Sequence, residues 1–347
     1  MSSSRITSTV DFEKDGRQTG FLRLPHSVHE SAYGWIPIPI VLLKNGAGPT
    51  ILLNSGNHGD EYEGQVSLIK LIRELRPEQV QGRIIFLPAA NFPAAMAGRR
   101  TSPIDGGNLN RAFPGDPDGT PTSMMAHYID QVILPLCDYA LDLHSGGSSL
   151  IYLPSALASL IPGQAARNTK LLELLEVFGA PISYVSTQPM GSNQTLGASA
   201  DRRGVLKLGT ELGGSGTLST AALKIADAGI RRILKHVGIV PDLAVAPSPG
   251  TRLMEVGGSD YFVYTTESGI FEPLVELGDT VAGDQLAAAI HFSHTPWQTP
   301  EIIRFERDGL VLCKRVPGRT ERGDCLFHLA TDYGKASESA HALRGKS

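Results

Sequence analysis

Short apolar runs alternate with segments of helical spacing between residues 49 and 237, and this pattern limits the possible folds more than any other feature of the chain. The predicted strands cover residues 51–53, 83–87, 139–143, 182–186 and 205–211. The predicted helices cover residues 66–75, 123–134, 169–178 and 217–237. Such alternation is typical of a mostly parallel sheet with helices on both faces. An earlier run, 35–43, contains two prolines and suits an opening strand at the sheet edge.

The chain of 347 residues is long enough for more than one hydrophobic core, since single cores stop growing at roughly 250–300 residues. Around residues 241–250 three prolines and a glycine stand close together, and no long helical period follows. Short runs such as 261–264 and 309–313 then alternate with glycines, which indicates a small all-β domain. We therefore expect a first domain over 1–245, a β-rich domain over 246–330 and a disordered tail over 331–347.

The charge balance argues against several kinds of partner. Lys and Arg total 31 against 35 Asp and Glu, a net charge of -4, so no basic field is expected for nucleic acid or an anionic membrane. No apolar run approaches the ~20 residues of a membrane-spanning helix, and the polar start lacks the apolar core of a secretory signal. We expect a cytoplasmic protein. The three cysteines form no CxxC pair, which favours buried thiols.

His58 and Glu61 stand three positions apart at the turn between the strand over 51–53 and the helix that follows. Glycines at 56 and 59 let the backbone approach closely, so the imidazole and the carboxylate can converge on one point. Open α/β sheets bind ligands at this end of their strands. Asp60 and Glu63 compete with Glu61 for the role of ligand, but helical geometry favours the residue at i+3.

A second predicted strand ends in His144, which glycines follow. Two histidines and one glutamate form one of the three-ligand sets of hydrolytic zinc sites, which leave one position open. We therefore predict a metal site at His58, Glu61 and His144. Asp142 alternates onto the same face as His144 and could orient its ring.

Two further groups accompany this predicted site. A turn-rich loop over 98–115 carries Arg99, Arg100, Asn110 and Arg111, and arginines on such a loop can bind a carboxylate or stabilise an oxyanion. Glu211 ends an extended run just before a glycine loop. It could serve a site at the sheet edge or simply cap the next helix.

Four strings together resemble the succinylglutamate desuccinylase/aspartoacylase family: His58-x-x-Glu61, Asn108-Leu109-Asn110-Arg111-x-Phe113, Asp142-Leu143-His144 and Thr210-Glu211-Leu212-Gly213. The likeness covers residues 51–329. It implies a zinc carboxypeptidase-like fold, with a catalytic domain over 1–245 and a barrel-like C-terminal domain. Within the family, the strings over 56–64 and 108–115 are most similar to the branch that deacetylates N-acetyl-L-2,4-diaminobutyrate in ectoine degradation.

The resemblance also implies roles for single residues. His58, Glu61 and His144 would hold one Zn²⁺ per chain, and Glu211 would be the catalytic acid and base. Asn110 and Arg111 would bind the substrate carboxylate. Arg100 is the better counterpart of the family's oxyanion-stabilising arginine, although the adjacent Arg99 competes for that role.

The implied function is an amidohydrolase that removes the acetyl group from a small N-acylated amino acid. One alternative is another N-acyl amino acid deacylase, of the succinylglutamate desuccinylase or aspartoacylase type. A metallocarboxypeptidase and a non-catalytic module with structural zinc are further alternatives. The likeness also makes a homo-oligomer, or association with a pathway enzyme, plausible.

Overall fold

The computed structural model describes residues 4–31, 33–186 and 193–334. The strands are β1 Thr7–Ser8, β2 Gly16–Pro25, β3 Trp35–Asn45, β4 Thr50–Ser55, β5 Gly82–Leu87, β6 Tyr139–His144, β7 Leu150–Tyr152, β8 Ser155–Ser159, β9 Ile182–Ser186, β10 Leu206–Glu211, β11 Arg252–Val256, β12 Phe262–Tyr264, β13 Gly269–Pro273, β14 Thr280–Val281, β15 Leu286–His291, β16 Glu301–Arg304, β17 Gly309–Arg315, β18 Arg319–Thr320 and β19 Cys325–Asp332. The α-helices are α1 Tyr62–Glu74, α2 Phe92–Ala97, α3 Pro121–Tyr128, α4 Ala165–Phe178, α5 Leu196–Arg203 and α6 Thr220–His236.

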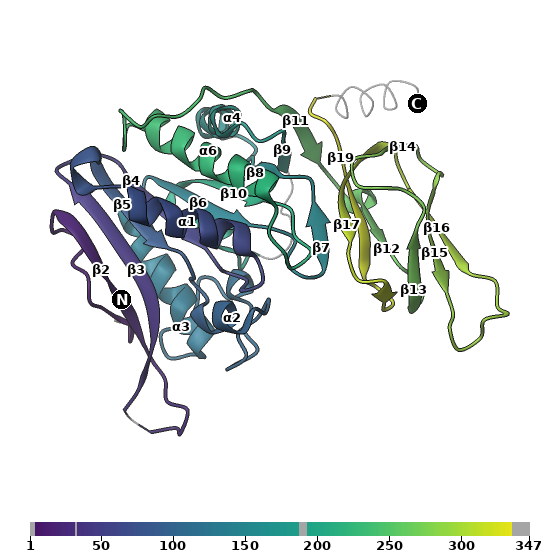
Figure 1. Cartoon of the computed structure of the whole chain (residues 1–347), viewed down its shortest axis with the longest axis horizontal. Coiled ribbons are helices and arrows are strands. Elements are labelled where there is room, and N and C mark those ends of the chain that lie inside the picture. Colours follow the sequence, from purple (N-terminus) through teal and green to yellow (C-terminus); the bar gives the residue numbers. More distant parts are fainter. Residues whose placement is uncertain (1–3, 32, 187–192, 335–347) are drawn as a thin grey trace.

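Most of these strands form one mixed sheet in the order β1-β2-β3-β5-β4-β6-β10-β8-β9-β11-β19-β17-β14 (Figure 1). The run β5-β4-β6-β10 is parallel, and so is the run β8-β9-β11. Antiparallel pairing joins the two runs and adds the edge strands β1 to β3. The predicted α/β fold with a mixed sheet is confirmed, but parallel pairing is confined to these two central runs, and the outer strands pair antiparallel. Because β4, β6 and β10 are parallel neighbours, their carboxyl ends meet at one edge of the sheet.

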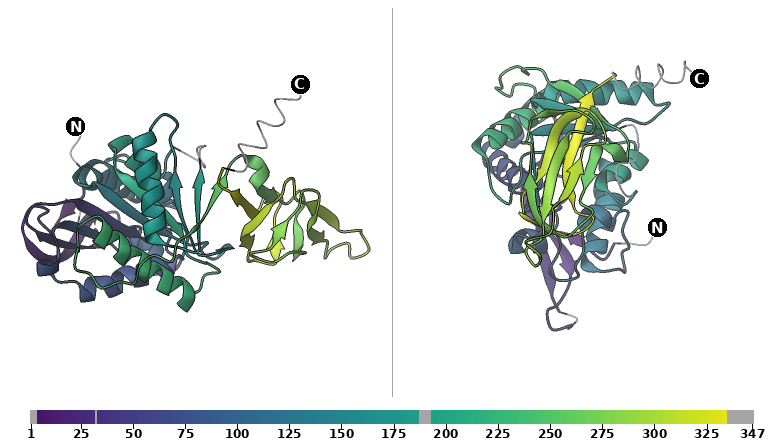
Figure 2. Two further views of the ribbon diagram at one scale, coloured as in Figure 1. Left: turned by 90° about the horizontal axis from the view of Figure 1, so that it is seen from above. Right: turned by 90° about the vertical axis from the view of Figure 1, so that its right-hand side faces the viewer.

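Helices cover both faces of this sheet because its central strands are apolar on both sides. Along β4, Ile51 and Leu53 pack into one core cluster, while Leu52 packs into another. The first cluster also contains side chains of α1, α4 and α6, and the second contains side chains of α3 and α5. Figure 2 shows helices on either side of the sheet in the view from above. Alternation of side chains along a strand places successive residues in different layers.

The helix expected over 123–134 is only partly regular. It begins as α3, where the Thr120 side chain accepts from the amide of Ser123, a common N-cap arrangement. A π-helical segment over Ile129–Ile133 and a 3₁₀ turn over Leu134–Leu136 then follow. α5 was not predicted, because its short stretch is too polar to show a helical period.

The C-terminal part consists of β strands, as the glycine-punctuated runs predicted. The four-stranded sheet β16-β15-β13-β18 faces β12, β14, β17 and β19, and their facing sides enclose one apolar cluster. Within this cluster the rings of Phe271 and Phe305 lie 5.7 and 5.6 Å from that of Phe327. Figure 1 shows this part beside the end of the large sheet.

Strand pairing crosses the expected domain boundary in two places. β11, which follows the predicted linker, pairs with β9 on one side and β19 on the other. β7 pairs with β17 of the C-terminal part. The division near residue 245 stays a prediction, because hydrogen bonding is continuous across it.

The predicted disordered tail begins too early. Thr331 and Asp332 belong to β19, where Met254 is the register partner of Asp332. Arg252 also donates to the Asp332 carboxylate over 2.8 Å, so pairing with β11 orders two residues that the polar composition marked as tail. Residues 335–347 lie outside the described residues. Within the described part of the chain, no helix is long and apolar enough to cross a membrane.

Candidate metal centre

His58 and Glu61 lie in the turn between β4 and α1, and this turn packs directly against α2. The amide of Gly59 donates to the carbonyl of Arg99 over 2.8 Å. A Cβ at Gly59 would lie 2.0 Å from the backbone of Ala94, so only glycine allows this close approach. The glycine next to His58 therefore fixes the place of the imidazole.

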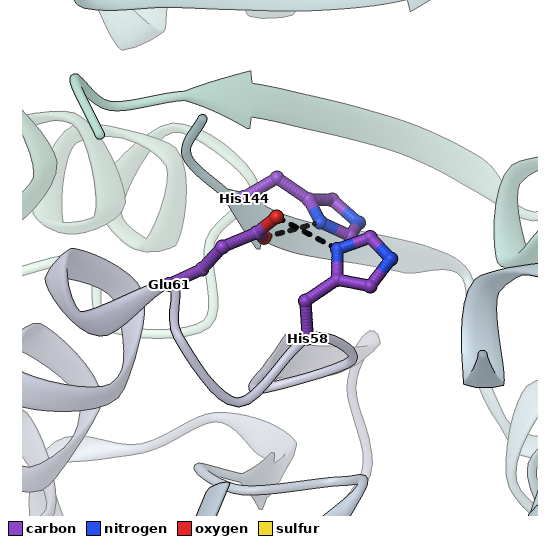
Figure 3. Close-up of side chains that lie close together, drawn as sticks. All are labelled: His58, Glu61 and His144. Carbon is purple, nitrogen blue, oxygen red and sulfur yellow. Dashed lines mark hydrogen bonds and ion pairs between the residues drawn. The ribbon is translucent and has the colours of Figure 1, made fainter. Parts of the chain in front are cut away.

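His58, Glu61 and His144 converge on one point (Figure 3). Nδ1 of His58 lies 2.7 Å from Oε1 of Glu61, and Nδ1 of His144 lies 2.7 Å from Oε2. One possible ligand atom from each residue lies within 4.8 Å of the others. The three residues are only 3%, 3% and 9% exposed. Two imidazole nitrogens and a carboxylate in this arrangement could hold a metal ion.

The second ring nitrogen of His144 contacts Asp142. Oδ2 of Asp142 lies 3.0 Å from Nε2 of His144. The other oxygen of Asp142 accepts hydrogen bonds from the side-chain amides of Asn54, over 2.9 Å, and Asn57, over 2.8 Å. Carboxylates behind a ligating histidine fix the orientation of its ring, so the expected role of Asp142 has a geometric basis.

The close approach of these groups shifts their pKa values in opposite directions. Burial raises the pKa of Glu61, but the charges of His144 and His58 outweigh burial and bring it well below its usual range. Burial lowers the pKa of His144, but Asp142 and Glu61 outweigh burial and raise it to about 10. A ligating imidazole must be neutral at its metal-binding nitrogen. A metal ion bound here would therefore displace a proton from His144, and its binding would become stronger as the pH rises.

Glu211 ends β10 directly beside His144, its register partner on β6. Its Oε2 is buried and has no hydrogen-bond partner among the described residues. Burial first, and then the charge of Glu61, raise the pKa of Glu211 to about 8. The structure therefore places a second carboxyl next to the cluster, and one of its oxygens is free to meet a ligand.

Two asparagines of the loop after α2 contact the histidines of the cluster. Oδ1 of Asn108 lies 3.1 Å from Nε2 of His58, and Nδ2 of Asn110 lies 3.3 Å from Nε2 of His144. Oδ1 of Asn110 also accepts from the amide of Leu196, the first residue of α5, over 3.0 Å. Asn110 thus connects the cluster to α5.

Two arginines of the same loop share one cavity. Arg100 donates from Nη1 to Oε1 of Glu61 over 3.3 Å. Burial first, and then the charge of Arg100, lower the pKa of Arg111. Guanidinium groups in one cavity favour the binding of an anion. Arg100 and Arg111 line the cavity beside the cluster, whereas Arg99 is not among its described lining residues.

All seven predicted site residues open onto this one cavity of about 440 Å³. Its wall also includes aromatic rings from both parts of the chain, which the motifs did not indicate: Tyr152, Tyr184, Phe262 and His328. His328 stacks on Phe262 with ring centroids 4.4 Å apart. Neither ring nitrogen of His328 has a hydrogen-bond partner in the described chain.

Residues 47–237 match the succinylglutamate desuccinylase/aspartoacylase catalytic domain. This match covers more than half of the chain. The chain belongs to the succinylglutamate desuccinylase/aspartoacylase family. The fold and the hydrolase class that the sequence motifs predicted are therefore confirmed at the level of this family.

Relatives within the family match nearly the whole chain. N-alpha-acetyl-L-2,4-diaminobutyric acid deacetylase of Halomonas elongata is 42% identical over 327 residues, which are 94% of this chain and 95% of that protein. The product-bound ectoine utilization protein EutE (DoeB) of Ruegeria pomeroyi is 39% identical with a TM-score of 0.91, over 95% of this chain and 100% of that one. A succinylglutamate desuccinylase/aspartoacylase of Rhodobacter sphaeroides is 41% identical with a TM-score of 0.89, over 96% and 100%.

The family motifs account for part of the cavity lining but not for its aromatic residues. Phe262 and His328 belong to β12 and β19, which pair with each other. A buried histidine in a strand pattern is normally read as a core residue, so only its missing hydrogen-bond partners identify it as unusual. Asp201 and Lys207 also line the cavity, and the sequence offered no spacing that would have selected them.

Proposed function

We propose that this chain is a zinc-dependent amidohydrolase that removes the acetyl group from N-acetyl-L-2,4-diaminobutyrate. One observation carries the proposal. This chain is 42% identical to a deacetylase of this compound, and one cavity of it holds a His-Glu-His cluster beside Glu211, whose buried Oε2 has no hydrogen-bond partner among the described residues. The agreement extends over 94% of the chain, so it includes both parts of the cavity wall.

His58, Glu61 and His144 would hold the zinc ion. Their donor set fits zinc, because two imidazoles and one carboxylate form a known three-ligand set of catalytic zinc sites. The contact between Asp142 and the second ring nitrogen of His144 also fits, since ligating histidines commonly donate that N–H to a carboxylate. When bound, zinc would lower the pKa of a coordinated water and polarise the acyl carbonyl.

Glu211 would carry the proton during the reaction. Its Oε2 has no hydrogen-bond partner among the described residues, and the side chain lines the same cavity as His144 and Glu61. A carboxyl whose pKa is raised to about 8 can both accept and donate a proton near neutral pH. Glu211 would first accept a proton from the attacking water and then give it to the departing amine.

The loop after α2 would bind the remaining charged groups of the substrate. Arg111 and Asn110 would hold the amino acid carboxylate, and Arg100 would stabilise the negative charge that develops on the acyl oxygen. The contact of Arg100 with Glu61 supports this division, because it places Arg100 nearer the cluster.

The decisive experiment measures acetate release from N-acetyl-L-2,4-diaminobutyrate by purified protein. The protein is assayed as isolated, after chelation and after restoration of zinc, with zinc content measured at each step. We expect activity that chelation abolishes and zinc restores. N-succinylglutamate, N-acetylaspartate and short peptides serve as competing substrates. A clear preference for any of them would contradict the proposed substrate but leave the metal site intact.

A further inference from the structure

Three carboxylates line the cavity: Glu61, Asp201 and Glu211. Glu61 is held between two imidazoles, and Glu211 is the proposed proton carrier. The proposed substrate carries a side-chain ammonium group, and a cation that leaves water without an anionic partner is costly to bind. Asp201 is the one acid among the described lining residues that the proposed reaction leaves without a role.

Asp201 forms an ion pair with Arg167 of α4. Its Oδ1 pairs with Nη2 of Arg167, and Nη1 of the same arginine donates to the carbonyl of Ser159 over 3.0 Å. Asp201 lines the cavity, whereas Arg167 is not among its described lining residues. No hydrogen bond to Oδ2 of Asp201 is seen among the described residues. The ion pair therefore orients the carboxylate and leaves its second oxygen for a ligand.

The charges around Asp201 do not fully compensate it. Lys207 also lines the cavity, but its Nζ lies 3.8 Å from Oδ2 of Asp142 and pairs with that carboxylate. Burial raises the pKa of Asp201 even though Arg167, Lys207 and Arg202 act in the opposite direction. A carboxylate in this state is stabilised further by another cation.

The position of Asp201 on α5 also fits the proposed substrate. The amide of Leu196 donates to Oδ1 of Asn110, so the start of α5 lies beside the residues proposed to hold the carboxylate. Asp201 follows Leu196 by five positions, a rise of ~7.5 Å along a helix. This offset leaves room for a short diamino acid between its two charged ends.

We propose that Asp201 binds the side-chain ammonium group of the substrate and thereby selects diamino acids over neutral ones of the same carbon skeleton. This inference rests on the proposed function, and it names the substrate-recognition residue that the reaction itself does not require. The recognition is electrostatic. It therefore acts on the charged substrate and not on its neutral counterpart.

The test compares two substrates that differ only in the ammonium group, N-acetyl-L-2,4-diaminobutyrate and N-acetyl-L-2-aminobutyrate. For Asp201→Asn we expect kcat/KM on the diamino substrate to fall roughly 10- to 100-fold, mainly through KM. The neutral substrate should change less than about threefold, since it never used the charge. Asp201→Glu keeps the charge but moves it, and should give an intermediate loss on the diamino substrate alone.

A matched control removes Asp130, another aspartate that forms an ion pair with an arginine, in this case with Arg203 of α5. Oδ2 of Asp130 lies 2.7 Å from Nη2 of Arg203, and Asp130 does not line the cavity among the described residues. Asp130→Asn should change kcat/KM on both substrates alike.

Equal losses of kcat/KM on both substrates in Asp201→Asn and Asp201→Glu would overturn the inference, as would no loss on the diamino substrate. A wild-type protein inactive on the diamino substrate would instead overturn the proposed function and the inference with it.

Discussion

Asp142 and His144 lie two positions apart on β6, and Oδ2 of Asp142 contacts Nε2 of His144 over 3.0 Å. Both side chains therefore point to the same face of the strand, as period-two alternation requires. The contact leaves Nδ1 of His144 directed at Glu61. One strand thus supplies both a proposed metal ligand and the carboxylate that orients it.

Replacing Asp142 with asparagine should weaken metal binding while the three donors remain. The loss of an orienting carboxylate typically costs roughly 10- to 100-fold in metal affinity. Competition with a chelator of known affinity measures this directly. Asp138→Asn is the control. Asp138 also accepts a hydrogen bond of 2.8 Å, from the amide of Thr50, but it does not belong to the site. Equal affinity in Asp142→Asn and wild type would contradict the orienting role.

The convergence of the His-Glu-His cluster could be predicted because the signals of its residues are local. His58 and Glu61 are three residues apart in one turn, and His144 ends an apolar run. Parallel neighbours bring such strand ends together without any knowledge of the side-chain packing. The contact between Asp142 and His144 needed the structure, because it depends on which way two buried side chains turn.

Replacing Glu211 with glutamine should abolish turnover but leave the metal bound. Loss of a positioned acid and base typically costs 10²- to 10⁴-fold in rate, whereas glutamine keeps the size of the side chain. Single-turnover rates and metal content are measured together. Glu63→Gln is the matched control, since Glu63 is also buried and burial raises its pKa to about 7. Retained turnover in Glu211→Gln, or metal loss in Glu63→Gln, would refute the assigned roles.

His328 should make the metal-free protein less stable as the pH falls. Burial lowers the pKa of its ring from 6.5 to about 3, so the folded state keeps it neutral. Between these values the unfolded chain binds the extra proton, and stability is lost as the pH decreases through this window. From pH 7 to pH 4.5 this one group should cost about 2–3 kcal/mol.

Urea unfolding of His328→Phe at both pH values measures that difference. The variant should lose less stability than wild type between the two, because phenylalanine binds no proton. His294→Phe removes an exposed histidine and should behave like wild type. An identical loss in His328→Phe and wild type would exclude His328 as the source.

The wall that contains His328 could not be predicted from local patterns. Its residues come from pairings between distant segments, such as Tyr152 with Cys313 across β7 and β17. Phe262 likewise faces His328 as its register partner across β12 and β19. Periodicity within a strand reports which face is buried but not which distant strand lies beside it.

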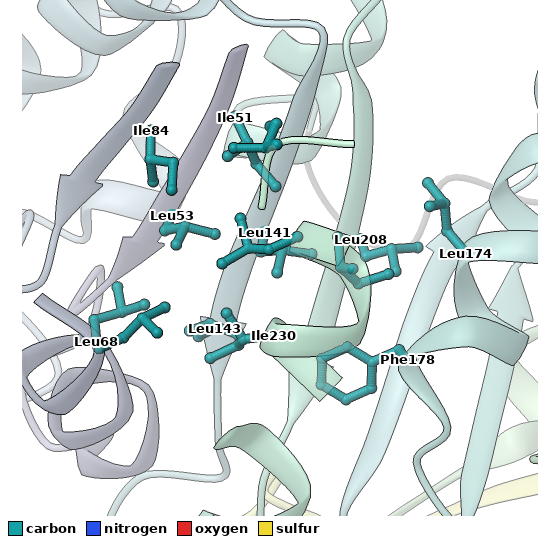
Figure 4. Close-up of a cluster of buried hydrophobic side chains, with 14 of the residues drawn as sticks. Ile51, Leu53, Leu68, Ile84, Leu141, Leu143, Leu174, Phe178, Leu208 and Ile230 are labelled. Atoms are coloured by element: carbon teal, nitrogen blue, oxygen red, sulfur yellow. The ribbon is translucent and has the colours of Figure 1, made fainter. Parts of the chain in front are cut away.

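Replacing Gly64 with alanine should destabilise the protein although alanine is the better helix former. A Cβ at this position in α1 would lie 2.6 Å from Cβ of Leu143 and 3.0 Å from Cβ of Ser55. Figure 4 shows Leu143 among the packed side chains of this layer, with Leu68 of α1 nearby. Overpacking of this kind typically costs 1–3 kcal/mol, measured as the free energy of unfolding.

Gly197→Ala provides the comparison. A Cβ at Gly197 would lie no closer than 3.5 Å to any neighbouring atom. Only the gain in helix propensity then remains, which should raise the free energy of unfolding by up to roughly 0.8–1 kcal/mol. If Gly64→Ala were as stable as wild type, the close contact between α1 and β6 would not be rigid.

Replacing Arg100 and Arg99 separately should resolve which arginine acts in the reaction. Arg100 lines the cavity and donates to Glu61 over 3.3 Å, whereas Arg99 contributes its backbone carbonyl to the turn at Gly59. Removing a donor that stabilises developing negative charge typically costs 10²- to 10³-fold in kcat. We expect this loss in Arg100→Met and nearly unchanged kcat in Arg99→Met, measured at saturating substrate. A lower kcat in Arg99→Met together with an unchanged kcat in Arg100→Met would contradict this assignment. The guanidinium of Arg100 would then serve only to balance the charge of Glu61.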